Sequence, residues 1–558
     1  MSTRIKLLAA MVCIAMTAHA QNPDWANKAA KAVISITTFD ANATMIAKCQ
    51  GCFIDEEGTA IAPFAPFKGA SRAIAVDGAG KEYEVEYMLG ANEMYDISKF
   101  KVKNPKKITA LATTATPSTV GTKAWLLPYS TKKPTCEETT ITKVEKVIDN
   151  YNYYTFSLTS SDEQTGLPLL TDDGRLIGLL QPSLKSTDGK SYAVSALLAD
   201  SLKISGLSIN DKTLNSTLIP KDLPNRADEA LVSLYLMQGS KNTALRDQLT
   251  DRYIEKFPKS SNGYFFKAQT LSHDNRFDEA RQLMETAIKT ADDKAEAHYN
   301  YCQLIYDKEI NMADKPYSDW TLDLALQEAQ KAYSTSPMPI YLQGQAAVLF
   351  AQKKYDEAGK IYLQLADTKL RSPENFFAAA RCKEMLGDSA ATLALLDSTI
   401  ACYERPYLKE AAPYLLYRAQ TLVADKQYRK AVADYNDYET LMSTSVNDRF
   451  YYLRALAETE GKLYQQALDD YAKAIEKNPS SDLYHAELAA LQYRFGMYDE
   501  CQQNAEKCIE LAPDGSDGYL FLGLAQTKKG KKEEGMKNLL KAKELGDTQV
   551  DELIKKLD

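Results

Sequence analysis

The second half of the chain repeats itself, and this repetition constrains the fold more than any other feature of the sequence. Small residues recur at intervals of 36, 34 and 34 positions, at Ala431, Ala467, Cys501 and Gly535. In the clearest copies, residues 354–366, 463–479 and 497–513, an aromatic residue stands three positions before the small one. A period of this length indicates paired helices that stack, with small residues where two helices touch closely. The sequence therefore predicts an all-α solenoid of about nine repeats over residues 225–547, with an insertion near 308–320 and a capping helix at 548–558.

The first half has a different pattern. Between residues 21 and 204, short apolar runs such as AVISITTF, YEVEYML and LIGLLQPSL are separated by Gly, Pro, Asn and Asp. Many short strands at this spacing are typical of a β-barrel or a β-sandwich. Residues 205–224 lose the alternation, which predicts a linker.

The repeated units resemble the tetratricopeptide repeat (TPR), a helix-turn-helix unit that stacks into a superhelix. The resemblance implies protein or peptide partners, held in the groove of the array. Polar residues on the first helices of repeats are the candidates for partner contact: Asn300, Arg381, Arg418, Arg454 and Gln492. The alternative for each is an ordinary solvated face. The tyrosines at repeat positions, such as Tyr362, Tyr435 and Tyr471, are interpreted as core.

Four stretches of the first half resemble trypsin-like serine proteases, particularly the bacterial periplasmic HtrA type. They are GCFIDEEGTAIAPFAPFKGASRAIAV, YEVEYMLGANEMYDISKFKV, DEQTGLPLLTDDGRLIGLL and SYAVSALLADSL, in the order that the family has them. The resemblance implies a double β-barrel over residues 21–204. It places the catalytic histidine at Ala65, the aspartate at Asp96 and the nucleophile at Thr165. Glu163, Gln164 and Gly166 stand where the family has its oxyanion loop.

The chemistry of this family needs a base beside the nucleophile and backbone donors aimed at the developing oxyanion. Ala65 offers no base. The four histidines of the chain are His19, His273, His298 and His485, none of them within residues 21–204. We therefore interpret the domain as a pseudoprotease. The alternative is an active peptidase centred on Thr165, with a lysine or a base donated by the repeats.

The loop around Ala65 is apolar, with the sequence Pro63-Phe64-Ala65-Pro66-Phe67. These side chains are expected to fill or cover the cleft. They either repack it or turn it into a peptide-binding groove. Asp96 is expected to remain as a structural hydrogen-bonding residue.

Residues 1–20, MSTRIKLLAAMVCIAMTAHA, combine a charged start, a short apolar stretch and a small-x-small end, which predicts a cleaved signal peptide. We expect a periplasmic or extracellular protein, of bacterial type, with no membrane-spanning segment after cleavage. Eight cysteines follow the signal, and Cys49-x-x-Cys52 falls in an expected strand rather than at a helix start, which disfavours redox catalysis.

A net charge of -8 without a basic patch argues against nucleic-acid binding. No spacing of residues predicts a metal site or a cofactor. The favoured function is an exported protein-interaction scaffold, a catalytically dead protease-like domain joined to a TPR superhelix. The alternatives are the Thr165-centred peptidase and, from location alone, the handling of polysaccharide or envelope lipid.

Overall fold

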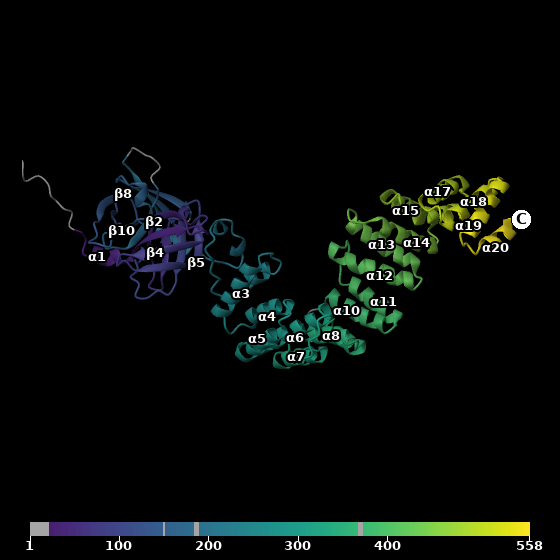
Figure 1. Ribbon diagram of the computed structural model, residues 1–558, viewed down its shortest axis with the longest axis horizontal. Helices are drawn as coiled ribbons and strands as arrows, with labels where there is room; N and C mark the ends of the chain where they lie inside the picture. Colours follow the sequence, from purple (N-terminus) through teal and green to yellow (C-terminus); the bar gives the residue numbers. More distant parts are fainter. Residues whose placement is uncertain (1–21, 149–150, 183–188, 367–371, 558) are drawn as a thin grey trace, which may run out of the picture. The chain divides into compact units, whose positions relative to one another are not determined.

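The computed structural model describes residues 22–148, 151–182, 189–366 and 372–557. The signal peptide expected at 1–20 lies outside these residues. By its internal contacts the chain divides into two compact units, Met1–Asp293 and Lys294–Asp558, called here the first and the second unit. The first contains all the described strands and the first helices, and the second is helical (Figure 1).

The first unit begins with two closed β-barrels of six antiparallel strands each. The first barrel has the strand order β1-β2-β3-β6-β5-β4. Its strands are β1 Val33–Phe39, β2 Met45–Phe53, β3 Thr59–Ala62, β4 Arg72–Asp77, β5 Glu82–Asn92 and β6 Ile97–Val102. Alternate side chains point inward, as the two-residue period of a strand requires, and Phe53, Met88 and Phe100 fill the interior.

The second barrel has the order β10-β11-β12-β9-β8-β7. Its strands are β7 Lys123–Leu126, β8 Glu137–Ile148, β9 Tyr151–Phe156, β10 Pro168–Thr171, β11 Leu176–Leu180 and β12 Ser191–Ser195. Tyr154, Phe156 and Leu169 lie in its core. A further cluster of buried residues joins Cys52 and Ile61 of the first barrel to Trp125 and Leu170 of the second. The predicted double barrel of trypsin-like type is therefore confirmed.

Residues 205–224, expected to be a linker, are in fact packed on the first barrel. Leu214 and Ile219 are buried in the core of that barrel. The backbone of this segment pairs with β5, since Met88 N donates to Pro220 O at 2.8 Å and Asp222 N donates to Met88 O at 3.1 Å. The segment lacks strand periodicity, but it buries apolar side chains, including Leu214 and Ile219, and so is not a free connection.

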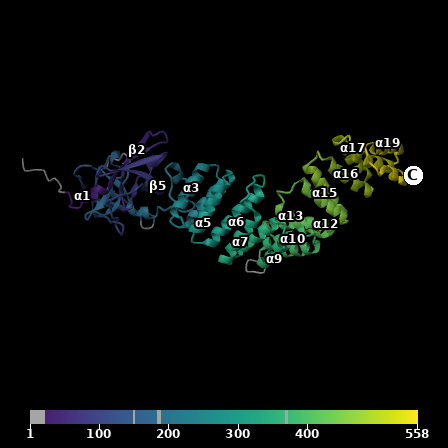
Figure 2. The same cartoon turned by 60° about the horizontal axis from the view of Figure 1, so that its bottom comes forward.

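The helices that follow form pairs. In the first unit they are α2 Ala227–Met237, α3 Thr243–Lys256, α4 Ser261–His273 and α5 Phe277–Thr290. In the second unit the first six are α6 Lys294–Asn311, α7 Leu322–Thr335, α8 Pro339–Ala351, α9 Tyr355–Ala366, α10 Pro373–Met385 and α11 Ser389–Ile400. They are followed by α12 Ala412–Ala424, α13 Tyr428–Met442, α14 Asp448–Glu460, α15 Tyr464–Lys477, α16 Asp482–Arg494, α17 Tyr498–Leu511, α18 Ser516–Lys528, α19 Lys532–Glu544 and α20 Val550–Leu557 (Figure 2).

The small residues of the repeats are buried where paired helices touch. Ala431, Ala467 and Cys501 are each 0% exposed. Gly523 of α18 and Gly535 of α19 meet so closely that a Cβ on Gly523 would lie 2.8 Å from Gly535 O. Tyr362, Tyr435 and Tyr471 are buried as expected. The predicted helical TPR-type array is confirmed.

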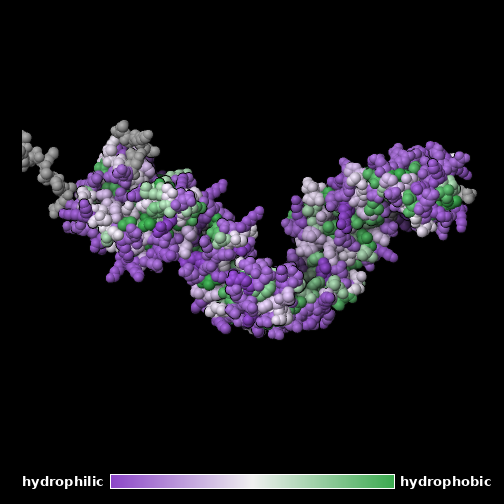
Figure 3. Space-filling view, viewed as in Figure 1, coloured by the Kyte–Doolittle hydropathy of each residue, from purple (hydrophilic) through white to green (hydrophobic). Residues whose placement is uncertain are grey.

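The ends of this array and its insertion are also packed. Val550 of the capping helix α20 is buried against Leu520 and Leu539. The inserted loop between α6 and α7 buries Trp320, whose Nε1 donates to Tyr301 Oη at 3.0 Å. Polar residues cover most of the face seen in Figure 3, and apolar side chains show there in small groups. None of the described helices is both long enough and apolar enough to cross a membrane.

Candidate functional site

The positions expected for the catalytic histidine and aspartate lie side by side. Ala65 begins the short 3-10 helix η2 Ala65–Phe67, and its backbone N–H donates to Asp96 Oδ1 at 2.6 Å. Asp96 immediately precedes β6 and has φ of +46°. The buried Ser98 hydroxyl donates to Ala62 O at 3.0 Å, which holds the loop in place. The carboxylate thus binds a main-chain amide where a protease would have it orient an imidazole.

The expected nucleophile, Thr165, follows a second 3-10 helix, η3 Asp162–Gln164. Gly166 has φ of +89°, and a Cβ there would lie 2.1 Å from Gln50 O and 2.8 Å from Pro63 Cδ. Only glycine fits such a position. Because Pro63 is two residues before Ala65, the fold brings the Thr165 loop to the loop that carries Ala65.

Gln50 of β2 connects the loop that carries Thr165 to the first barrel by hydrogen bonds. This role of Gln50 was not predicted from the sequence. Its backbone N–H donates to Thr165 O at 3.1 Å, and its Nε2 donates to Glu163 O at 3.4 Å. Its Oε1 accepts from Tyr129 N at 2.7 Å. The sequence signal for this role is a polar residue, Gln50, inside the otherwise mainly apolar strand AKCQGCF. Gln164 closes the other side of the loop, where its Oε1 accepts from Ser161 N at 2.8 Å.

In the described part of the chain, no side chain forms a hydrogen bond with the hydroxyl of Thr165. Cys49 in β2, another nucleophilic side chain of the first barrel, is buried, and burial raises the pKa of its thiol to about 12, with Asp96 adding to the effect. A thiol with that pKa is protonated at neutral pH. Cys52 lies in the same strand and its pKa is likewise raised by burial.

Phe64 and Phe67 do not fill the cleft, contrary to expectation. Phe64 and Phe67 are both 0% exposed and belong to the core of the first barrel, where the Phe67 ring packs 5.4 Å from that of Phe100. Burial in an existing core is more favourable for a phenyl ring than partial cover of a solvent-facing cleft. Pro63 is buried and Pro66 half-buried.

The expected partner contacts on the array are largely internal. Asn300 and Gln492 are buried, and Asn504 Nδ2 donates to Gln492 Oε1 at 3.1 Å. Arg454 is 3% exposed, whereas the Arg418 side chain is partly exposed, at 16%. Because their side chains are buried, Asn300, Arg454 and Gln492 are not available to a ligand, contrary to expectation.

Arg418 and Arg454 each form hydrogen bonds with residues of two neighbouring helices. Arg418 of α12 forms a two-bond pair with Asp434 of α13, at 2.8 and 2.7 Å, and donates to Asp397 of α11 at 2.8 Å. Arg454 of α14 pairs with Asp470 of α15 at 2.5 and 3.1 Å and donates to Glu439 of α13 at 2.7 Å. In both cases the aspartate follows the arginine by 16 residues. That spacing was readable in the sequence.

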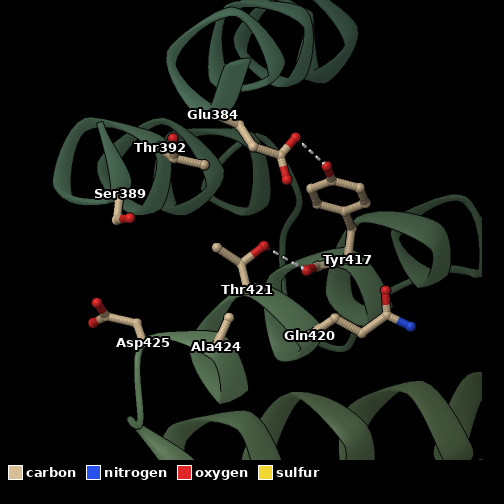
Figure 4. Close-up of a pocket in the computed structure, with 8 residues that line it drawn as sticks. All are labelled: Glu384, Ser389, Thr392, Tyr417, Gln420, Thr421, Ala424 and Asp425. Atoms are coloured by element: carbon tan, nitrogen blue, oxygen red, sulfur yellow. Dashed lines mark hydrogen bonds between the residues drawn. The ribbon is translucent and has the colours of Figure 1, made fainter. Parts of the chain in front are cut away.

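Arg381, the fifth candidate, stands beside a hollow in the array. The hollow has a volume of about 370 Å³ and lies between α10, α11 and α12. Figure 4 shows its lining, in which the Glu384 carboxylate accepts from Tyr417 Oη at 2.5 Å. Arg381 Nε lies 3.0 Å from the same carboxylate. Thr421, Gln420 and Asp425 add polar groups to its wall.

No group of three or more His, Cys, Asp or Glu side chains in the described residues is arranged to hold a metal ion. All eight described cysteines are unpaired.

The fold defines a class: a trypsin-like double β-barrel followed by a tetratricopeptide repeat array. Residues 409–482 match the tetratricopeptide repeat family model.

Relatives and solved structures match the two parts separately. The Hsp70-Hsp90 organizing protein of Triticum aestivum is 26% identical over 233 residues, which cover 39% of this chain and 37% of that protein. The small glutamine-rich tetratricopeptide repeat-containing protein 2 of Saccharomyces cerevisiae is 30% identical over 95 residues, 17% of this chain and 28% of that protein. The matches thus span well under half the length of these relatives.

Two solved proteases are similar to about a third of this chain. A protease of M. tuberculosis in its active form has a TM-score of 0.29 and 13% identity, over 33% of this chain and 85% of that one. The serine endoprotease of Yersinia pestis has a TM-score of 0.28 and 15% identity, over 35% of this chain and 68% of that one.

Proposed function

We propose that this protein is an exported interaction scaffold, in which a catalytically inactive protease-like domain accompanies a TPR array that binds protein or peptide partners. The observation that carries the loss of catalysis is the contact of Asp96 with the Ala65 amide. In that position a protease needs an imidazole to take the proton of the nucleophile. Gln50, bound to Glu163 and Thr165, supports the same conclusion because it engages the loop that would form the oxyanion hole.

Reaction with a fluorophosphonate probe tests the inactive state. Such probes label a hydroxyl that a neighbouring base activates, so the mature chain should remain unlabelled and should not cleave a casein substrate. Labelling that disappears in Thr165→Ala would instead support the alternative, an active peptidase centred on Thr165. The Ser160→Ala variant is the control, since that hydroxyl is buried against Ser191 Oγ at 2.7 Å.

The binding role is supported by the match of residues 409–482 to the tetratricopeptide repeat, a module whose stacked helices form extended binding surfaces. The name of one relative, the Hsp70-Hsp90 organizing protein, points toward protein partners here as well. The hollow beside Gln420 and Tyr417 is the place on the array where we expect a peptide to lie.

Site-specific photocrosslinking tests that placement. A benzoylphenylalanine at Gln420, in the wall of the hollow, should give a discrete adduct with a protein of the cell envelope. The same residue at Lys430, exposed on α13, is the matched control and should give none. Equal yields at both positions, or no adduct at either, would contradict the proposal. Recovery of the mature chain from a periplasmic extract tests export.

A further inference from the structure

A hollow of the first unit lies between the first barrel and α3. It measures about 760 Å³, within the size range of small-ligand and peptide pockets. One wall is the segment 215–221 together with Tyr87 of β5, and the other is the face of α3 that carries Leu245 and Leu249. It is called here the α3 cavity.

The walls of the α3 cavity are held by polar contacts. The Arg252 guanidinium lies 4.4 Å from the centre of the Tyr87 ring and donates to Asp222 Oδ1 at 3.2 Å. Lys256 Nζ donates to the other Asp222 oxygen at 2.9 Å. Because these bonds connect α3 to the barrel side, the cavity is formed before any ligand arrives, which lowers the entropic cost of binding.

The cavity has an apolar lining with an exposed leucine. Leu218, in the extended segment, is 63% exposed, whereas its neighbour Ile219 is 2% exposed in the barrel core. Leu218, Pro220 and Leu245 all line the cavity. An aliphatic group that covered Leu218 would remove apolar surface from water, which is favourable by about 25 cal/mol per Å².

Lys221 supplies a cation at the edge of this lining. Its ammonium donates to Asn215 Oδ1, and among the described residues no carboxylate lies within ion-pair distance of it. Burial lowers the pKa of Lys221, with Asp211 opposing the effect, so its charge is partly desolvated. The two carboxylates of the lining have partners: Asp251 pairs with Lys267, and Glu255 with Arg252.

The main chain at Lys221 also offers polar groups, an N–H and a C=O. Met88 of β5 bonds to Pro220 O and Asp222 N, so the N–H and C=O of the intervening Lys221 point away from the strand. Gln248 adds an amide on the α3 side. Main-chain and amide groups suit the hydrogen-bonding needs of a peptide better than those of a hydrocarbon chain.

We propose that the α3 cavity binds the carboxyl end of a partner peptide, with an aliphatic last side chain against Leu218 and Leu245 and the terminal carboxylate at Lys221. This site is separate from the hollow between α10 and α12 and goes beyond the function proposed above.

Fluorescence anisotropy of labelled peptides with the full mature chain tests the proposal. The probes are the hexapeptide Gly-Ser-Gly-Ser-Gly-Leu with a free carboxylate, its amide, and the same peptide ending in Gly. We expect the free acid with Leu to bind most tightly, and the other two to bind about tenfold more weakly. Equal binding of acid and amide, or no binding of any probe, would overturn the proposal.

Two exposed leucines of one segment provide a matched pair of variants. Leu218→Asp should weaken binding of the free acid by about tenfold, because a carboxylate would replace apolar lining. Leu207→Asp changes a leucine that is 67% exposed and lies outside the lining, and should bind normally. Equal effects of the two variants would overturn the proposal.

The Lys221→Gln variant separates the contribution of the Lys221 charge from that of the apolar lining. It should bring the affinities of acid and amide to within about twofold of each other while the preference for Leu over Gly remains. An unchanged ratio of acid to amide would contradict the role of Lys221. Decanoate is the last probe. If it displaces the peptide, and if its own binding is weakened by Leu218→Asp but not by Leu207→Asp, the cavity is a site for a lipid carboxylate. The peptide proposal would then be wrong.

Discussion

At the scale of single residues, the centre around Arg454 is the clearest departure from an apolar repeat core. The guanidinium is bound to Asp470 and Glu439, and Glu458, 3% exposed, lies 3.9 Å from it. The Asp470 and Glu439 carboxylates and the Glu458 carboxyl thus surround one buried cation, and Lys473 of α15 donates to Asp470 at 3.1 Å from a more exposed position.

Replacing the cation should destabilise the array strongly. In Arg454→Met, buried carboxylates lose their partner, which typically costs about 3–5 kcal/mol. Lys473→Gln is the control, since its side chain is 45% exposed and should cost less than about 1 kcal/mol. Urea unfolding monitored by helical circular dichroism measures both. Similar midpoints for the two variants would show that the buried pair contributes little.

The same centre predicts a pH dependence. Burial, reinforced by Asp470, raises the pKa of Glu458 from 4.5 to about 8. Because the folded value lies above the unfolded one, the stabilising contribution of the protonated carboxyl is fully present below pH 4.5 and is lost as the pH rises through about 8. Melting temperatures between pH 5 and pH 9 should therefore fall less in Glu458→Gln than in the natural chain. Parallel curves would exclude this assignment.

At the scale of elements, the contact of α18 with α19 sets a steric limit. An alanine in a helix is usually about 1 kcal/mol more favourable than glycine. A Cβ at position 523, however, would lie 2.8 Å from both Gly535 O and Leu539 Cγ. We expect Gly523→Ala to lower stability by about 1–3 kcal/mol, by forcing the helices apart. Gly239→Ala is the control, because nothing lies within 4 Å of a Cβ there; a stabilised Gly523→Ala chain would contradict the close contact.

The sequence predicted the helices and strands better than the contacts between polar side chains. The repeat period located the buried Ala431, Ala467 and Cys501, because close helix packing admits only small side chains. Alternation predicted the strands for a similar reason, and the ordered resemblance brought Ala65 and Asp96 together. Gln50 was missed, since its partners Thr165 and Tyr129 are distant from it in the sequence. Phe64 was misplaced because an apolar loop gives no sign of which side it packs on.

At the scale of the whole molecule, Arg252 is a main connection between barrel and helices in the first unit. Arg252→Ala removes the stacking on Tyr87 and the bond to Asp222. We expect α3 to become sensitive to trypsin and chymotrypsin while the barrels resist, as followed by mass spectrometry of the fragments. Arg276→Ala, whose side chain is 53% exposed and pairs with Glu279, should leave the cleavage pattern unchanged. Identical patterns would show that other contacts suffice.

The packing of residues 205–224 has a practical consequence for cutting this protein into parts. A fragment that stopped at residue 204 would lack Leu214 and Ile219, and would leave a hole in the core of the first barrel. Each missing side chain would cost roughly 2–5 kcal/mol, a large share of the stability of one domain. A gene fragment for the barrels should therefore run through Asp222, where the pairing with Met88 ends. The barrel domain thus extends some twenty residues beyond residue 204, where the alternating strand pattern of the sequence ends.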